Sequence, residues 1–193
     1  MGKFIKPLIF ILAMVPFGVL LLRVVFNELG PDPAQELAME TGEWTLRFLL
    51  VTLALTPLQR LTGMIVFTRQ RRMLGLFALL YATVHFLVWI AFLLGFRWFA
   101  IVEELIERPY ITVGFSAYLI LLALGITSPK SMVRRLGRNW KRLHRLVYLA
   151  GILGIVHLLW ILRTNISEAL LYGGILFVLL GYRVYYSRGR KIL

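Results

Sequence analysis

Three histidines are the residues of this chain whose type and position could do redox or metal chemistry. His144 and His157 share one apolar stretch, residues 140–160, with His144 at its basic entrance and His157 deep inside it, and His85 lies in a second apolar stretch. An ionisable side chain within a membrane span is costly to bury, so such residues are functional candidates by default. A neutral imidazole is a good ligand for transition metals, including haem iron.

Composition identifies the chain as a membrane protein of one domain. Its residues are 60% hydrophobic with a mean hydropathy of +0.80, whereas an ordinary soluble domain is about 45–50% apolar. The absence of cysteine excludes disulfides, thiolate metal sites and cysteine-ligated iron–sulfur clusters. The longest hydrophilic stretch, roughly residues 27–43, is shorter than a folded domain of about 50 residues. We therefore expect a single transmembrane domain over residues 1–193, with any nucleotide-binding or substrate-converting domain on another polypeptide.

The hydropathy pattern predicts an all-α membrane protein, a bundle of six transmembrane helices. The spans cover roughly residues 8–26, 44–61, 73–95, 110–127, 143–162 and 168–186. The first span follows Lys3 and Lys6 as a signal peptide would, but its apolar run is longer, Pro16 interrupts it and no small-residue cleavage site follows. We expect it to be retained. No internal repeat is visible in the sequence.

Charged residues sort to two sides of the predicted bundle. One side carries all nine acidic residues together with Arg97, Arg108 and Arg163. The other side carries the remaining loop cations: Lys3, Lys6, Arg60, Arg69, Arg71, Arg72, Lys130, Arg134, Arg135, Arg138, Lys141, Arg142, Arg145, Arg183, Arg188, Arg190 and Lys191. The positive-inside rule then predicts that both termini of this multi-pass protein lie in the cytoplasm.

The net charge of +13 therefore reflects membrane topology and does not indicate nucleic-acid binding. The basic, amphipathic loop at residues 128–142 predicts attraction to anionic membrane lipid, and an acidic cytosolic partner would fit it as well. Arg23 and Arg47 lie inside the first two spans near their outer ends. Either they extend to the lipid headgroups, or they contact the carboxylates of a cofactor.

The depth of each histidine follows from the predicted topology. His85 and His157 lie roughly 18 and 21 Å above the cytoplasmic edge at about 1.5 Å per residue. His144 lies about 20 Å below His157, which excludes a three-histidine zinc centre, whose ligands all lie about 2 Å from one ion. Matched depth on facing helices is what a two-histidine axial pair needs. The alternative is that each histidine makes a hydrogen bond to a neighbouring helix, and that His144 contacts lipid headgroups.

Small residues lie on the cytoplasmic side of both deep histidines and would leave room for a flat macrocycle. They are Ala78, Ala82, Ala150, Gly151 and Gly154. Small residues also occur wherever membrane helices pack closely, so tight packing is the alternative explanation.

Four segments of this sequence resemble a known family: residues 30–33 (Gly-Pro-Asp-Pro), 71–86, 108–114 and 140–160. They are similar to the haem-binding membrane subunit of the periplasmic protein-methionine-sulfoxide reductase system, within the ferric-reductase-like transmembrane family. The resemblance implies b-type haem in the bundle, with FMN also associated. It implies electron transfer from the quinone pool or a cytosolic flavin donor to a periplasmic molybdopterin reductase that repairs oxidised methionine in envelope proteins. The chain itself would then be an electron-transfer subunit without catalytic residues.

The wider superfamily places two histidines on each of two helices, and this resemblance implies roles for five residues. His85 and His157 correspond to the outer axial pair of a haem. His144 corresponds to a ligand of an inner haem, but Arg71 and Arg72 stand where its partner histidine would fall. His144 therefore either ligates a second haem with an unusual partner or supports a flavin or quinone site. The two arginines could hold haem propionates, a flavin phosphate or lipid headgroups.

Two other functions are compatible with parts of the pattern. A self-contained transmembrane ferric reductase or oxidase would also use paired histidines, but it needs a cytosolic flavin and nicotinamide domain. A non-redox structural or transport bundle would explain the hydropathy without using the histidines.

Overall fold

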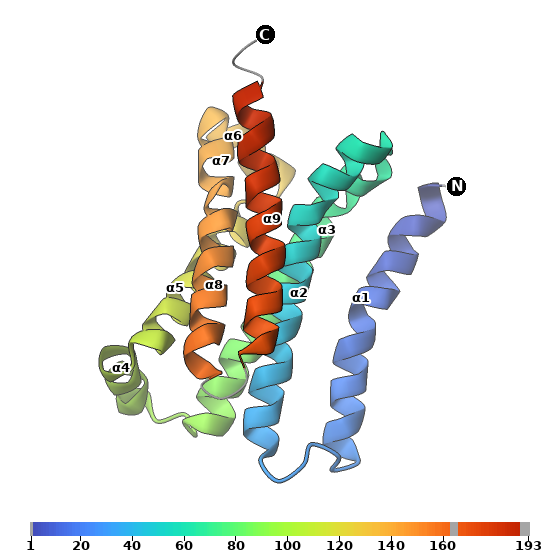
Figure 1. Ribbon diagram of the computed structural model, residues 1–193. Helices are drawn as coiled ribbons and strands as arrows, with labels where there is room; N and C mark the ends of the chain where they lie inside the picture. Colours follow the sequence, from blue (N-terminus) through green and yellow to red (C-terminus); the bar gives the residue numbers. More distant parts are fainter. Residues whose placement is uncertain (1, 163–165, 190–193) are drawn as a thin grey trace.

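The structure, a computed structural model, describes residues 2–162 and 166–189, and within them every regular element is a helix, with no β-strand (Figure 1). The elements in chain order are α1 (Gly2–Val25), α2 (Pro33–Thr62), α3 (Val66–Val88), the π-helix η1 (Trp89–Leu93), α4 (Trp98–Glu107), α5 (Pro109–Ile126), α6 (Lys130–Leu136), α7 (Arg138–His144), α8 (Leu146–Ile161) and α9 (Ser167–Gly189). The predicted all-α fold is confirmed.

Five helical stretches of the described chain are long and apolar enough to cross a membrane. They are Phe4–Val25, Val66–Leu93, Pro109–Ile126, Arg138–Ile161 and Ser167–Tyr186. The remaining predicted span, residues 44–61, lies within α2, which has 30 residues but carries four charged residues in its first half and Arg60 near its end. α2 is therefore long enough to span but less apolar than its neighbours, and it occupies the middle of the bundle.

The loops group at two ends of the bundle, as Figure 1 shows. The α1–α2 connection, α4 and the start of α9 lie toward one end, which we call the acidic end because all nine acidic residues lie there. The start of α1, the α2–α3 connection, α6, α7 and the end of α9 lie toward the other, the basic end. Arg163, Arg190 and Lys191 lie outside the described residues, as do the side chains of Lys3 and Arg188.

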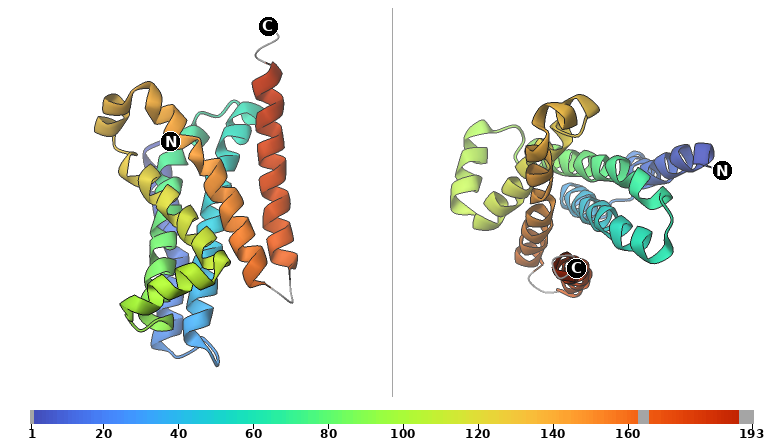
Figure 2. Two further views of the ribbon diagram at one scale, coloured as in Figure 1. Left: turned by 90° about the vertical axis from the view of Figure 1, so that its left-hand side faces the viewer. Right: turned by 90° about the horizontal axis from the view of Figure 1, so that it is seen from above.

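Two antiparallel helix pairs form the centre of the fold. α2 packs along α3, and α5 packs along α8, with α9 against α2 and α8. Seen along the bundle, α2 and α3 lie between α1 on one side and the α5–α8 pair on the other (Figure 2). The buried core divides accordingly into a cluster that joins α1, α2, α3, α5 and α8 and a second cluster that joins α2, α8 and α9.

One buried hydroxyl joins α1 to the centre of the fold. Tyr81 of α3 is fully buried, and its hydroxyl accepts a hydrogen bond from the Phe17 N–H at 2.9 Å and donates one to the Ala13 carbonyl at 3.0 Å. Pro16 lies in the same turn of α1, and proline disturbs the regular helix ladder. Because backbone groups in a bilayer have no water to bond, Tyr81 stabilises α1 at the point where Pro16 weakens it.

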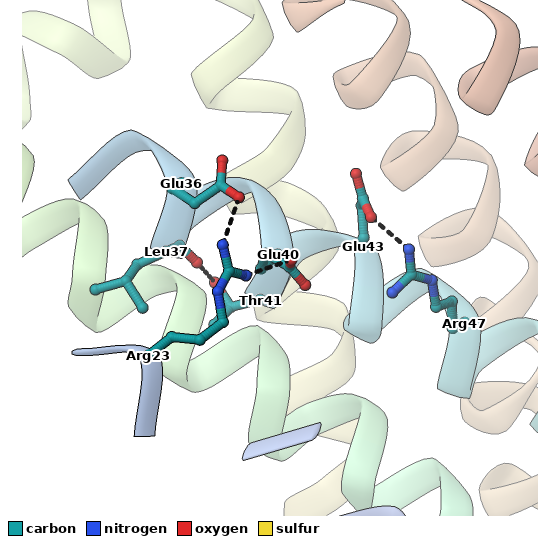
Figure 3. A network of polar contacts seen from close by, with 7 residues as sticks. All are labelled: Arg23, Glu36, Leu37, Glu40, Thr41, Glu43 and Arg47. Carbon is teal, nitrogen blue, oxygen red and sulfur yellow. Dashed lines mark hydrogen bonds and ion pairs between the residues drawn. The ribbon is translucent and has the colours of Figure 1, made fainter. Parts of the chain in front are cut away.

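Ion pairs join α1 to α2 at the acidic end. Figure 3 shows the Arg23 guanidinium between two carboxylates of α2, 3.2 Å from Glu36 and 2.9 Å from Glu40. The sequence offered a lipid headgroup or a cofactor carboxylate as the partner of Arg23. The observed partners are two protein carboxylates, which hold the end of α1 on the start of α2.

Arg47 is likewise bound within the protein. It pairs with Glu43 one turn earlier on α2 (Figure 3), lies over the Trp44 ring and donates a hydrogen bond to the Tyr172 hydroxyl of α9 at 2.9 Å. Neither alternative drawn from the sequence named these partners. The cation instead connects α2 to α9, so both span arginines serve the packing of helices around α2.

Tyr81→Phe removes the hydroxyl that bridges Phe17 and Ala13. We expect the free energy of unfolding to fall by about 1–3 kcal/mol, the cost of leaving buried polar groups without their partner. Unfolding of the detergent-solubilised protein, followed by circular dichroism, measures the change. Tyr185→Phe is the control because Tyr185 is exposed on α9; an equal loss of stability in both variants would contradict the role of the Tyr81 hydroxyl.

Candidate functional site

A cavity of about 670 Å³ lies among α2, α3, η1, α5 and α8, and His85 and His157 both line it. This volume is within the range of about 300–1,000 Å³ that small-molecule and cofactor sites occupy. The charged lining residues, Glu43, Arg97, Glu104 and Arg108, come from the acidic end of the bundle. The lining toward the basic end is apolar or small.

The predicted small residues divide between the cavity and the helix packing. Ala82, Ala150 and Gly154 line the cavity on the side of the histidines that faces the basic end. Ala78 is fully buried in the core, and a side chain at Gly151 would contact Leu176 of α9 at 3.4 Å. Three of the five small residues therefore line the cavity, and two serve helix packing.

The structure brings His85 and His157 together across the cavity. Their ring centres are 6.2 Å apart and their planes are nearly perpendicular, at 85°. His85 Nδ1 lies 2.8 Å from the Ala38 carbonyl oxygen of α2, and His157 Nδ1 lies 2.6 Å from the Tyr110 carbonyl oxygen of α5. A carbonyl oxygen can only accept a hydrogen bond, so a neutral ring carries its proton on Nδ1 and leaves Nε2 with a lone pair.

The separation of the two rings suits a shared metal ion. A bond between imidazole nitrogen and a metal is about 2.0–2.1 Å long, and a ring centre lies roughly 1 Å behind its nitrogen, so two imidazoles on opposite sides of one ion have centres about 6 Å apart. The observed distance of 6.2 Å agrees. A hydrogen bond from the far nitrogen to a carbonyl also fixes the tautomer and orientation of a ligating histidine, as both carbonyls would do here.

A glycine on the neighbouring helix makes room for each histidine ring. We call the carbonyl, the glycine and the ring together a histidine seat. A Cβ atom at Gly42 of α2 would lie 3.2 Å from His85 Nδ1, and a Cβ atom at Gly114 of α5 would lie 2.7 Å from both Nδ1 and Cε1 of His157. The second distance is shorter than real Cβ contacts allow. Each histidine therefore reaches its carbonyl because the helix opposite has no side chain at that point, and the constraint is stricter for His157.

The two histidine seats repeat one pattern along the chain. In both, the accepting carbonyl lies 47 residues before the histidine and four residues before the glycine. Every part of the first seat therefore lies 72 residues before its counterpart in the second, and the same offset relates Ala78 to Ala150 and Ala82 to Gly154. The sequence alone indicated no internal repeat. The structure corrects that, because α2–α3 and α5–α8 are two similarly built helix pairs that face each other across the cavity.

His144 lies apart from this pair. It ends α7 at the basic end, where its ring stacks on Trp140 with centres 4.0 Å apart and its Nδ1 lies 3.2 Å from the Trp140 carbonyl oxygen. Arg72 donates from Nε to the Ser128 hydroxyl at 3.0 Å, and Arg71 is half-buried nearby in the sequence. The cavity is lined by neither arginine nor by His144.

Sequence reasoning missed the residues at the rim of the cavity. Arg108 pairs with Glu104 at 3.1 Å and donates to the Tyr110 hydroxyl at 3.3 Å. The hydrogen bond to Tyr110 and the neighbouring Glu104 raise the pKa of Arg108 above its ordinary value. Arg97 lies on the rim as well. The visible signal was that Arg97 and Arg108 are cations on the otherwise acidic side of the chain, but the sequence did not connect them to the histidines.

Residues 41–155 match the family described as ferric reductase like transmembrane component, a segment that contains Gly42, His85, Gly114 and His144. The protein-methionine-sulfoxide reductase heme-binding subunit MsrQ of Xanthomonas euvesicatoria pv. vesicatoria is 52% identical over 159 residues, which cover 82% of this chain and 73% of that protein. The protein of the same description from Bordetella pertussis is 43% identical over 182 residues, 93% of this chain and 88% of that protein. No solved structure matches the chain.

Gly114→Ala forces a methyl group into the His157 ring, whereas Gly42→Ala only crowds His85. We expect Gly114→Ala to lower the free energy of unfolding by about 1–3 kcal/mol through overpacking, and Gly42→Ala to lower it less. Gly174→Ala is the matched control, because a Cβ atom there meets nothing within 4 Å. Chemical unfolding in detergent ranks the three, and a Gly114→Ala variant as stable as Gly174→Ala would contradict the seat described for His157.

Proposed function

Because the chain belongs to the ferric reductase-like transmembrane family, with relatives described as heme-binding subunits of protein-methionine-sulfoxide reductase, we propose that it carries electrons through the membrane on b-type haem. The observation that carries this proposal is the pair formed by His85 and His157, 6.2 Å apart across a cavity between two helix pairs. The residues present fit the cofactor, because both rings can offer a lone pair on Nε2 to one iron.

In this proposal the protein fixes the ligands and excludes water. Bound haem supplies a one-electron carrier whose potential depends on its axial ligands and surroundings. The Ala38 and Tyr110 carbonyls hold the Nδ1 protons of His85 and His157, which makes the opposite nitrogens more basic ligands. The apolar lining toward the basic end, including Leu121 and Ala150, shields the ring face from polar groups.

The electron acceptor is a separate protein. We infer that the acidic end faces the periplasm and passes electrons to a molybdopterin methionine-sulfoxide reductase that repairs oxidised envelope proteins, while catalysis stays on that partner. The distribution of charge supports an inner-membrane topology with both termini in the cytoplasm. The printed descriptions of the relatives support the partner system. A single membrane domain over residues 1–193, without substrate chemistry of its own, fits this division of labour.

A second electron-carrying site is proposed at the basic end. His85 is 13 residues from Arg72 on one helix, a rise of about 20 Å, so electrons from the quinone pool or a cytosolic flavin donor need an intermediate stop. His144 is the candidate ligand, and the 72-residue offset makes Arg72 its counterpart in the other helix pair. We propose that His144 binds a second haem or supports FMN or quinone, and that Arg71 and Arg72 bind carboxylate or phosphate groups there.

His85→Ala and His157→Ala should each abolish the same bis-histidine haem, because either substitution removes one of its two axial ligands. The measurement is haem per polypeptide by pyridine haemochrome assay, together with the optical spectrum of gently purified protein. The control is His144→Ala, which should retain that haem. Normal haem spectra in both His85→Ala and His157→Ala proteins would refute the proposed ligands.

His144→Ala should selectively remove the cofactor at the basic end. Haem and flavin per polypeptide are counted in the wild type and the variant, and we expect one haem or one FMN to be lost while the His85–His157 haem persists. An Arg145→Ala variant controls for the loss of a long side chain at the adjacent position. Unchanged haem and flavin content in His144→Ala would refute a haem or FMN site at His144 and leave the first site untouched.

A further inference from the structure

The charged side chains that line the cavity are confined to one side of it. The charged lining residues are Glu43, Arg97, Glu104 and Arg108, all at the acidic end, whereas the lining toward the basic end is formed by residues such as Ala82 and Leu121. A rigid ligand with an apolar body and anionic groups on one edge fits such a cavity in one orientation only. The charged residues on the rim therefore indicate the orientation of a bound ligand.

An unusual backbone conformation brings Arg97 to this rim. After His85, the α-helix changes to the five-residue π-helix η1, and Phe96, a non-glycine residue, has a φ of 57° beside Gly95 at 58°. Positive φ is sparsely populated for residues with a Cβ atom, and π-turns and strained residues concentrate at functional sites. The reversal places Arg97 on the cavity lining, where its Nε donates to the Leu94 carbonyl at 3.1 Å.

One cation on the rim, Arg97, has no acidic partner among the described residues. Arg108 is paired with Glu104, and Glu43 is paired with Arg47. Arg97 forms no ion pair with any part of the chain that the structure describes, and the one hydrogen bond of its side chain there uses Nε only. The two terminal nitrogens of its guanidinium thus remain available on a cofactor-sized cavity, in the geometry that binds a carboxylate through two parallel hydrogen bonds.

We propose that Arg97 binds a carboxylate side group of the haem and so turns the carboxylate edge of the cofactor toward the acidic end. This rests on the haem site proposed above. Haem b carries two carboxylate groups on one edge and is otherwise apolar, which matches a cavity with one unpaired cation on its rim and a mostly apolar interior. Arg108 lies on the same rim but is already neutralised by Glu104, so it contributes less than Arg97.

This orientation of the cofactor would determine where electrons leave the protein. The carboxylate edge is the polar part of the cofactor, and its orientation toward Arg97 brings it to the mouth of the cavity beside α4. A partner at the acidic end would then approach the cofactor edge directly. Arg97 acts as a positioning residue, since it binds the cofactor without ligating the iron.

The test compares two ligands and three proteins. Full-length wild type, Arg97→Gln and Arg69→Gln are reconstituted in detergent with protohaem and with its dimethyl ester, which lacks free carboxylates. Arg69 is the matched control because it is an exposed cation at the basic end, so its replacement changes the net charge equally. Haem loss to an excess of apomyoglobin gives the dissociation rate, and a redox titration gives the midpoint potential.

We expect Arg97→Gln to lose protohaem roughly ten- to hundredfold faster than the wild type, the ratio for one charge-assisted hydrogen bond. The midpoint potential should fall, because removal of a nearby cation disfavours the reduced state. The wild type should lose the ester faster than protohaem, and this preference should shrink in Arg97→Gln but persist in Arg69→Gln. Arg108→Gln should show the same changes at smaller size.

The proposal is overturned if Arg97→Gln and Arg69→Gln retain protohaem equally, or if the wild type does not distinguish protohaem from the ester. The comparison of protohaem with its ester uses the wild type, so it tests the proposal even if Arg97→Gln does not fold. A wild type that binds neither haem would refute the haem site itself. A wild type that binds haem through His85 and His157 but shows no role for Arg97 would refute only this inference and indicate a lipid headgroup contact for Arg97.

Discussion

Two hydrogen bonds from histidine to a backbone carbonyl are the interactions on which the site depends. A carbonyl inside a helix is normally covered by the side chain one turn later, and here that position is Gly42 or Gly114, so the imidazole can approach the helix closely. Each bond selects one tautomer and directs the other nitrogen away from the supporting helix. The helix opposite each histidine thus determines which nitrogen of that histidine is free to bind a ligand. Because both seats use the same spacing of carbonyl, glycine and histidine, the two rings lie across one cavity from each other.

α2 lies at the centre of the fold and contributes to one of these two hydrogen bonds. It supplies the Ala38 carbonyl and Gly42 for the first seat, yet it is the most highly charged of the long helices. Polar groups at membrane depth are tolerated where they are paired within the protein. Arg23 and Arg47 provide such pairing, the first by binding α1 to two α2 carboxylates and the second by joining α2 to α9. α1 and α9 therefore stabilise α2 through its charged residues, and α2 in turn presents the Ala38 carbonyl and Gly42 to the cavity.

The sequence predicted the features that depend on the length and spacing of segments, such as the spans and the depth of the histidines. It did not predict the features that depend on which side chains of neighbouring helices face each other. Hydropathy located the long helices but not α4 or α6, and it took the region of α6 for a loop. Depth counting paired His85 with His157 and separated His144 from them. The repeat escaped notice because its two copies share few identical residues and the equal spacing matters only once carbonyl, glycine and histidine are seen together. The partners of Arg23 and Arg47 depend on the rotation of neighbouring helices, which composition does not reveal. Arg97 depends on a π-turn and on positive φ at a phenylalanine, and the sequence marks neither.

The repeated construction also bears on the difference between the two ends of the bundle. At the acidic end both copies are complete, each with a carbonyl, a glycine and a histidine. At the basic end the second copy has His144, whereas the corresponding residue of the first copy is Arg72. An arginine is always charged and offers only donors, so it cannot replace a neutral imidazole as a ligand with a free lone pair. It can instead bind an anion. The two copies therefore provide equivalent histidines at one end and side chains of dissimilar chemistry at the other.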